Sequence, residues 1–305
     1  MANFSGGDCT AADFPPPVFF LPMCICLPPR LQTIAVVLLV PAFVLAGCDR
    51  GTGTHAGSEA AASAPPPAPA APAPVVLQDV IETTPTYIVG ISYPQVASKY
   101  PALAQAVHVY AEATRAQLMR AVAGLHGQKP EVPYDLSLSF TQVVETSRVV
   151  AVAAEGSSFI GGAHGNPLVE RFVWLPQRQQ MLAAEQLIPD AANWAPVAAH
   201  VREQLMTGLS QQLDDDGVEA GVRAQQLKRG SKWIDAGTTP EPKHFSRFEP
   251  VMNADGSIRA LRFVFPPEQV AAYEEGTRTA EVPAKVLLPL VAAQYRALFR
   301  AEPSL

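Results

Sequence analysis

The sequence is poor in charge for its length. Only 16% of its 305 residues are charged, and 22 Lys and Arg against 28 Asp and Glu give a net charge of −6. No run of three Lys or Arg residues occurs, whereas clustered positive charge is what binds the phosphates of a nucleic acid. Nucleic acid is therefore not expected as a partner.

Cysteine is also scarce, and all four cysteines lie before the residues expected to fold, so no disulfide is expected within the folded domain. Three of the four cysteines lie in the first 26 residues, and the fourth is Cys48. Cys24 and Cys26 have no second pair and no histidine nearby, which argues against zinc. The six histidines form no i,i+3 or i,i+4 pair, which is the spacing of ligands on a helix. We therefore expect neither a metal nor a cofactor.

The main hydrophobic run has the layout of a secretory signal. Residues 31–45 read LQTIAVVLLVPAFVL, follow Arg30, and end in the sequence LAGC at 45–48. The run is short for a membrane span, and small residues after it are typical of a cleavage site. LAGC resembles the lipobox of bacterial lipoproteins, which implies cleavage before Cys48 and acylation of its sulfur. An uncleaved signal anchor is the alternative, and both interpretations predict an extracytoplasmic protein held at a membrane, inner or outer.

Neither the residues before this signal nor those directly after it are expected to fold. Residues 1–30 contain acidic residues and prolines ahead of the signal, and a translation start assigned too far upstream explains them best. Residues 59–74 contain eight Ala and six Pro, a composition that cannot bury enough apolar area to fold. We interpret 1–47 as leader and signal peptide, and 48–78 as an extended tether.

Residues 79–305 have the patterns of a folded domain. Alternating apolar residues predict strands, and apolar residues repeating every three or four positions predict helices. The turn sequence Asn-Ala-Asp-Gly at 253–256 predicts a hairpin. The expected strands are 87–93, 136–140, 149–153, 168–175, 244–252 and 257–265, and the expected helices are 101–123, 194–213 with Asp190 as N-cap, and 284–300 with a break or first-turn position at Pro289.

These elements mix without regular strand–helix–strand alternation, which indicates an α+β fold. We expect mixed, largely antiparallel sheets packed with two to three long helices. The predicted domain has two halves, 79–150 and 151–305.

Two segments of this domain resemble the RsiV-like family. They read SSFIGGAHGN at 157–166 and FVFPPEQVAAYEEG at 263–276. In that family one strand ends in Tyr-x-Gly-Gly-Ala-His, and a later strand of the form F-x-F-x-x-Y-x-x-x-x-Y-x-x-G leads to an Ile-Pro element and a final helix. Here Phe159 stands where the family has Tyr, so any role of that hydroxyl is missing.

The first segment supplies candidate site residues: Gly161, Gly162, Ala163, His164, Gly165 and Asn166. Its glycines allow positive φ and close backbone approach, so exposed amides could bind an anion beside His164. A tight connection between two strands, with His164 hydrogen-bonded locally, is the reading we favour, because no acid or nucleophile is fixed nearby. The second segment supplies Tyr273, Glu274, Glu275 and Gly276, either as a turn that packs an aromatic ring or as part of a recognition surface.

The resemblance implies two contexts, a lysozyme-binding extracellular domain of an anti-sigma factor and an accessory domain of cell-wall deacetylases. We recognise neither a sigma-binding module nor the deacetylase metal motif in the sequence. We therefore expect a non-enzymatic lipoprotein, anchored to the bilayer through Cys48, that binds lysozyme or a peptidoglycan fragment. The alternatives are a structural envelope protein and a hydrolase or deacetylase in which His164 converges with Glu274 or Glu275.

Overall fold

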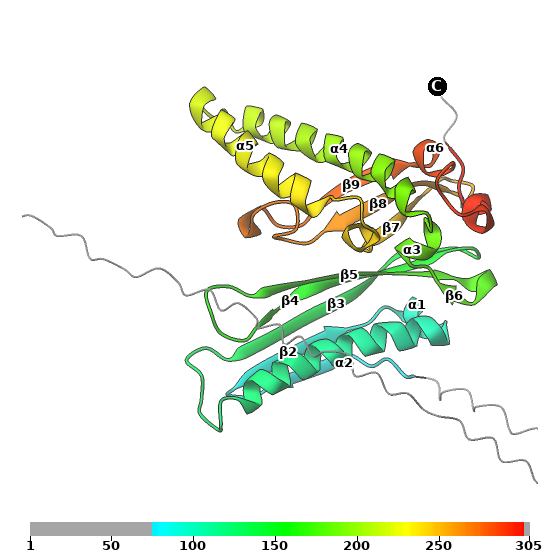
Figure 1. The fold of residues 1–305 in the computed structure, drawn as a ribbon. Coiled ribbons are helices and arrows are strands. Elements are labelled where there is room, and N and C mark those ends of the chain that lie inside the picture. Colours follow the sequence, from blue (N-terminus) through cyan, green and yellow to red (C-terminus); the bar gives the residue numbers. More distant parts are fainter. Residues whose placement is uncertain (1–74, 302–305) are drawn as a thin grey trace, which may run out of the picture. The chain divides into compact units, whose positions relative to one another are not determined.

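The structure is a computed structural model that describes residues 75–301. The predicted signal peptide, Cys48 and most of the predicted tether lie outside the described residues. The described chain contains a six-stranded sheet, a three-stranded sheet and three long helices, which confirms the predicted α+β class (Figure 1). None of these helices is both long and apolar enough to cross a membrane.

The larger sheet has the strand order β1-β2-β3-β4-β5-β6. Neighbouring strands are antiparallel except β2 and β3, which run parallel because a helical crossover joins them. The sheet includes the four strands that the alternating pattern predicts before residue 180. Its strands are β1 (Val80–Thr83), β2 (Tyr87–Ser92), β3 (Tyr134–Glu145), β4 (Val150–Phe159), β5 (Asn166–Leu175) and β6 (Gln180–Met181).

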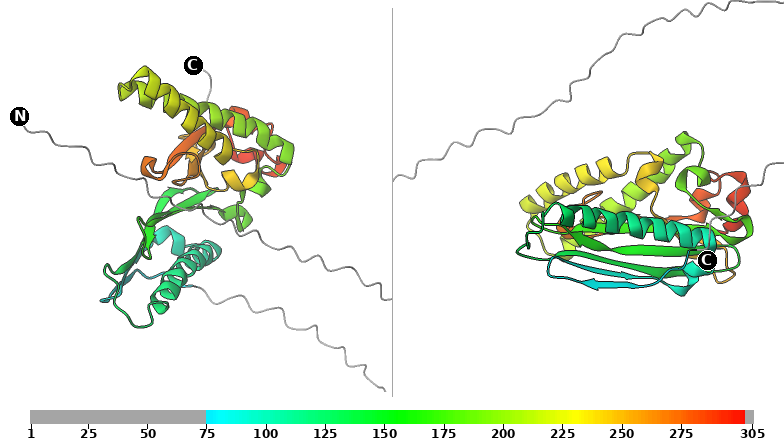
Figure 2. Two further views of the ribbon diagram at one scale, coloured as in Figure 1. Left: turned by 60° about the vertical axis from the view of Figure 1, so that its left-hand side comes forward. Right: turned by 90° about the horizontal axis from the view of Figure 1, so that it is seen from below.

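The crossover consists of α1 (Gln95–Ser98) and α2 (Pro101–Ala123), and α2 lies along one face of the larger sheet (Figure 2). It has the predicted bounds, since proline occupies its first turn and Gly124 follows its last residue. Its apolar stripe includes Leu103, Val107 and Leu118, which are fully buried in a cluster with strand residues such as Leu136. The stripe thus covers one face of the sheet.

The smaller sheet is an antiparallel meander of β7 (Phe248–Met252), β8 (Ile258–Phe265) and β9 (Arg278–Pro283). The predicted turn joins β7 to β8, and Gly256 adopts φ of 78° there. Hydrogen bonds from the hydroxyl and amide of Ser257, and from Arg300, lower the pKa of Asp255 to about 2. The hairpin is therefore confirmed, although β7 starts after the predicted residue 244 because Pro242–Phe245 form a 3₁₀ turn.

Two long helices, α4 (Trp194–Asp215) and α5 (Ala220–Gly237), form a hairpin beside the smaller sheet. α4 follows the prediction, but Asp190 caps the 3₁₀ turn before it, accepting from the amide of Ala192 at 2.9 Å, so its prediction as the helix N-cap is wrong. The sequence did not predict α5, which buries only Ile234 and Gly237 along its length. Its N-cap is Glu219, which accepts from two amides of the first turn.

The predicted last helix, 284–300, is wrong over most of its length, although the chain does break at Pro289 as predicted. The chain forms the short α6 (Ala284–Leu287), and a separate 3₁₀ turn covers Ala293–Leu298. Pro289 lies between the two, and a proline inside a helix removes one hydrogen bond and clashes with the preceding turn. The amide of Ala292 donates to Leu187, in α3 (Ala184–Leu187), instead of to its own helix.

A second hydrophobic cluster joins the two sheets. It combines Val173 and Leu175 of β5 with Phe263 of β8 and with Trp194. At its centre Phe245 is fully buried, with its ring stacked on Trp194 at a centroid distance of 5.3 Å. The smaller sheet is thereby packed on the face of the larger sheet that α2 leaves free, and α4 lies on the other side of the smaller sheet (Figures 1 and 2).

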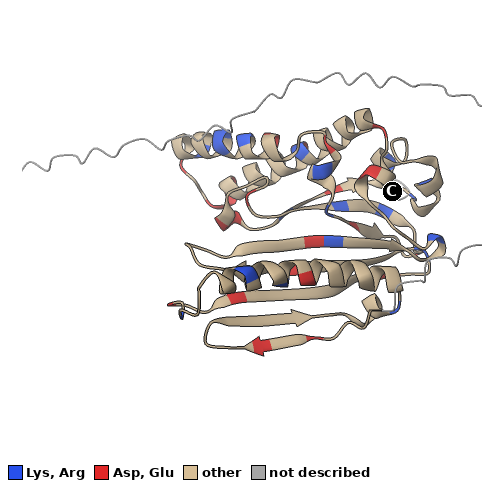
Figure 3. Ribbon diagram, turned by 60° about the horizontal axis from the view of Figure 1, so that its bottom comes forward, with Lys and Arg blue, Asp and Glu red and all other residues tan. Residues whose placement is uncertain are grey.

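A buried ion network lies at the same junction, although charged residues are sparse on the strands (Figure 3). Glu249 of β7 binds Arg171 of β5 at 2.8 Å and Arg262 of β8 at 3.0 Å. The side chains of Arg171 and Glu249 are only 6% and 10% exposed. Arg262 also binds Glu281. This hydrogen bond raises the pKa of the Arg262 guanidinium, and the hydrogen bond to Glu249 raises it further by a smaller amount. The network therefore ties the two sheets together by charge as well as by apolar packing.

Candidate functional site

The glycine-rich segment forms the loop between β4 and β5. Gly161 and Gly162 have φ of 94° and 104°, a region that L-residues rarely adopt, so the turn needs glycine at both positions. Ala163, His164 and Asn166 are exposed, and Asn166 begins β5 as the partner of Ser158 in β4.

His164 brings the two predicted motifs together. Its ring stacks on the ring of Tyr273, with a centroid distance of 4.0 Å and an interplanar angle of 29°. The imidazole Nδ1 lies 3.1 Å from the carbonyl oxygen of Gly165, and the hydroxyl of Tyr273 donates to that oxygen at 2.9 Å. Two segments that are 108 positions apart in the chain therefore meet at one carbonyl group.

The second motif forms a 3₁₀ turn, Tyr273–Glu275, that ends at Gly276 with φ of 71°. Glu274 and Glu275 are exposed, and Glu275 binds Arg278 at 2.6 Å. Within residues 75–301 no hydrogen bond or ion pair joins His164 to either acid. The hydrolase alternative needs His164 within hydrogen-bond reach of Glu274 or Glu275, and neither contact is present in the described structure.

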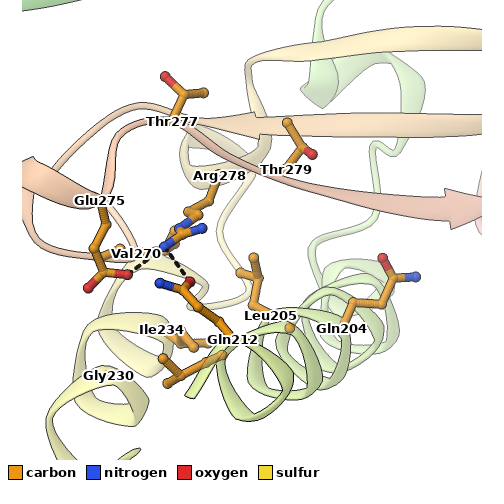
Figure 4. A pocket seen from close by; sticks show the side chains of 13 residues that line it. Gln204, Leu205, Gln212, Gly230, Ile234, Val270, Glu275, Thr277, Arg278 and Thr279 are labelled. Carbon is orange, nitrogen blue, oxygen red and sulfur yellow. Dashed lines mark hydrogen bonds and ion pairs between the residues drawn. The ribbon is translucent and has the colours of Figure 1, made fainter. Parts of the chain in front are cut away.

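A groove adjoins the second motif, between the α4–α5 hairpin and the start of β9 (Figure 4). Its volume is about 280 Å³. Apolar side chains form its floor, and amide, hydroxyl and charged groups surround them. The floor is formed by Leu205, Leu209, Ile234, Val270 and Ala271, and the polar groups belong to Gln204, Gln212, Glu275, Thr277, Arg278 and Thr279.

The polar groups of the groove are already oriented. Arg278 lies between the carboxylate of Glu275 and the side-chain oxygen of Gln212, at 2.6 Å and 3.0 Å (Figure 4). Gln204 is fixed by two hydrogen bonds to the backbone of Glu281, of 2.6 Å and 2.9 Å. Because the pair of Glu275 and Arg278 is about one-third exposed, its net strength is small. A ligand carboxylate could therefore replace Glu275 on Arg278 at little cost.

Two helical glycines shape the walls of the groove. A Cβ at Gly230 of α5 would overlap the end of the Leu209 side chain of α4, so a larger residue there would displace that side chain. A Cβ at Gly208 would meet no atom within 4 Å, which means that α4 leaves open space there. Such a groove, with an apolar floor and a few convergent polar groups, has the character of a small-molecule site.

The sequence predicted Glu275 as a candidate residue but missed the rest of the groove. The helix α5 supplies one wall, and that helix was not predicted. In the described part of the chain, no three His, Cys, Asp or Glu side chains gather closely enough to hold a metal ion.

Replacing Tyr273 by phenylalanine tests the contact between the two motifs. The variant keeps the ring against His164 but removes the hydrogen bond to Gly165, so we expect the free energy of unfolding to fall by about 1 kcal/mol. Urea denaturation measures this change. The control is Tyr134→Phe, because the Tyr134 hydroxyl makes no hydrogen bond in the described structure, although its ring lies near Gly161. Equal losses in both variants would contradict the assigned contact.

Comparisons with known proteins add fold neighbours but no function. No family model matches the chain, and no curated protein matches it. Among solved structures, it is similar to a DUF3298 family protein from Pseudomonas aeruginosa PAO1, with 15% identity, a TM-score of 0.47, and coverage of 74% of this chain and 96% of that one. It is also similar to a DUF3298 family member from Bacteroides fragilis NCTC 9343, with 12% identity, a TM-score of 0.40, and coverage of 72% and 93%. These structural neighbours are DUF3298 family proteins, and the resemblance to the RsiV-like family stays a prediction.

Proposed function

We propose that this chain is an extracytoplasmic lipoprotein whose folded domain binds a cell-envelope ligand without catalysing a reaction. The lipobox-like sequence at 45–48 and the Ala- and Pro-rich segment at 59–74 support the anchor and the tether. The groove between α4, α5 and β9 supports the binding role, because it combines an apolar floor with oriented polar groups. This groove is the observation on which the proposal depends.

Of the two envelope ligands considered, the groove favours a peptidoglycan fragment. Such a fragment carries acetamido methyl groups, which suit the floor at Leu205 and Ile234. Its hydroxyl and amide groups match the amide of Gln212 and the hydroxyl of Thr279, and its carboxylates match the guanidinium of Arg278. A groove of about 280 Å³ lies just below the usual range of about 300–1,000 Å³ for small-molecule sites, so it suits only a short fragment.

Lysozyme is the second candidate, and the net charge of −6 favours it. Opposite charges draw an acidic protein and a basic one together and raise the association rate. A stable protein–protein interface needs about 800 Å² on each partner, which is more surface than the groove provides. Lysozyme would therefore have to bind a broader surface than the one described above.

Calorimetric titration with N-acetylmuramyl dipeptide, and separately with lysozyme, tests both ligands. We expect heat of binding with the dipeptide, and we expect Gly208→Leu to abolish it because the new side chain would fill open space in the groove. Thr207→Leu is the matched control, since Thr207 is an exposed neighbour on α4 that does not line the groove. Heat with lysozyme alone would favour the second candidate, and heat with neither would contradict both.

The same titration also tests the non-catalytic part of the proposal. After the titration, chromatography of the dipeptide should recover it unchanged. If a deacetylated or cleaved product accumulated and disappeared in His164→Ala, the hydrolase alternative would replace the binding proposal.

A further inference from the structure

The outer face of α5 is exposed along the whole helix. The helix packs on α4 through the side that carries Gly230 and Ile234. On the opposite side Lys228, Arg229 and Lys232 are all exposed. Residues three and four positions apart are neighbours on a helix surface, so these three cations form one patch.

This patch is unusual in an acidic chain because the described structure pairs none of its three cations with an acid; Asp235, three positions after Lys232, pairs with Arg202 instead. Two other arginines of the α4–α5 hairpin are paired, Arg223 with Asp214 at 2.8 Å and Arg202 with Asp235 at 2.9 Å. Within residues 75–301, no ion pair involves Lys228, Arg229 or Lys232. Their positive charge therefore faces solvent (Figure 3 shows basic residues in blue).

Exposed apolar side chains run beside these cations. Val222 and Trp233 are 46% and 36% exposed, and both lie close to Arg229 in angle around the helix, at i−7 and i+4. Trp233 differs from the other two tryptophans, Trp174 and Trp194, which are 2% and 1% exposed. A tryptophan beside exposed Lys and Arg is typical of a helix that lies in a membrane interface, with its ring at the level of the headgroups.

We propose that the basic face of α5, formed by Lys228, Arg229, Lys232 and Trp233, docks onto an anionic lipid surface. The three cations are attracted to lipid phosphates, and the indole ring of Trp233 enters the interface. This function goes beyond the proposed ligand binding and does not depend on what the groove binds. Because Gly230 and Ile234 line the groove from the opposite side of the same helix, docking places α5 between the groove and the membrane.

The acidic end of the hairpin does not cancel this attraction. Asp214, Asp215, Asp216 and Glu219 gather where α4 passes into α5. Glu219 precedes Lys228 by nine residues, which is about 14 Å along a helix. That separation exceeds the screening length of about 8 Å at physiological salt. Docking is therefore expected to bring the C-terminal half of α5 to the surface while the acidic end tilts away.

Fluorescence quenching on vesicles tests the proposal. The full chain, with an N-terminal histidine tag, is held on vesicles through a nickel-chelating lipid, so attachment does not require acylation of Cys48. The vesicles contain phosphatidylcholine with brominated acyl chains, with or without phosphatidylglycerol. We expect Trp233 to be quenched only on the vesicles with phosphatidylglycerol, and we expect added salt to reverse the quenching.

Two charge-matched variants separate docking from a general loss of charge. The variant Lys228→Gln, Arg229→Gln, Lys232→Gln should lose the quenching. The control is Arg120→Gln, Lys129→Gln, Lys285→Gln, which removes the same number of charges from exposed positions elsewhere and should keep it. Circular dichroism of both variants checks that they are folded.

Three results would overturn the proposal: equal quenching on both kinds of vesicle, no quenching on the anionic ones, or equal loss in the two variants. A shift of Trp233 emission with soluble polyglutamate but not with vesicles would also overturn it, because the partner would then be a polyanion. Calorimetry with the dipeptide reports separately on the groove, so failure of docking and failure of ligand binding are distinguishable.

Discussion

Replacing Glu249 by alanine is expected to lower the free energy of unfolding by about 3–5 kcal/mol. The carboxylate of Glu249 binds Arg171 and Arg262, and the guanidinium of Arg171 is only 6% exposed. Removing the acid leaves that guanidinium buried beside a cavity, with Glu155 at 2.6 Å as its remaining acidic partner. Glu155 is largely exposed, so the guanidinium loses its buried acidic partner, and it cannot be rehydrated there without opening the junction between the sheets. Urea denaturation followed by circular dichroism measures the change.

The matched control removes the other acid that binds the same arginine. Glu155 also pairs with Arg171, but its side chain is 61% exposed. We expect Glu155→Ala to cost at most about 1 kcal/mol, because exposed ion pairs contribute little. If the two alanine variants lost the same stability, burial of the network would not be what makes Glu249 important.

Replacing the buried ion pair with apolar residues refines this test. In the double variant Arg171→Met, Glu249→Leu both charges are removed together. Apolar replacement of a buried pair is often neutral or stabilising, so much of the stability lost in Glu249→Ala should return. The charges would then serve mainly to align the sheets, whereas the apolar cluster around Phe245 supplies most of the stability.

The regular parts of the fold were predictable because their sequence patterns match the surfaces they bury. α2 and α4 each carry an apolar stripe that faces a sheet, and the stripe repeats at the helical period. The turn at Asn253–Gly256 was also predictable, since Gly256 supplies the positive φ that the hairpin requires. In these elements, local preference and tertiary packing favour the same conformation.

The helix α5 escaped prediction because it packs on a helix at the surface and buries little. Its apolar residues are few, and Val222 and Trp233 among them are partly exposed, so the helix shows no broad apolar stripe. The available signals were the N-cap Glu219 and the good helix formers that follow it. The prediction of a helix at 284–300 failed for the opposite reason. The apolar residues of this segment are buried as the pattern predicts, for example Val291 and Tyr295, but Pro289 prevents a continuous helix.

The candidate site was predictable in its parts and not in its assembly. Both motifs were singled out from the sequence, yet nothing in their spacing places His164 against Tyr273. That contact depends on how the two sheets pack, which is decided by long-range partners such as Arg171 and Glu249. One wall of the groove is formed by α5, and because the sequence did not predict this helix, it could not predict the groove.

Replacing Gly237 by alanine is expected to lower the free energy of unfolding by about 3 kcal/mol, at the upper end for overpacking a core. Gly237 is the last residue of α5 and is buried. A Cβ there would overlap the carbonyl oxygen of Gln269, and it would lie 2.7 Å from the carbonyl carbon of Gln269 and 2.8 Å from Val270. The Gln269 side chain also donates to the carbonyl oxygens of Gly237 and His244, at 3.1 Å and 3.0 Å, so the backbone of Gln269 cannot move away freely.

The control for this variant should change stability in the opposite direction. Gly208→Ala places the same methyl group on α4, where a Cβ meets no atom within 4 Å. Alanine is a better helix former than glycine by about 1 kcal/mol, so this variant should be more stable than the parent chain. Urea midpoints that move apart for the two variants would establish that α5 is held at its end by close backbone packing. Midpoints that rise together would place the end of α5 away from Gln269, and with it one wall of the groove.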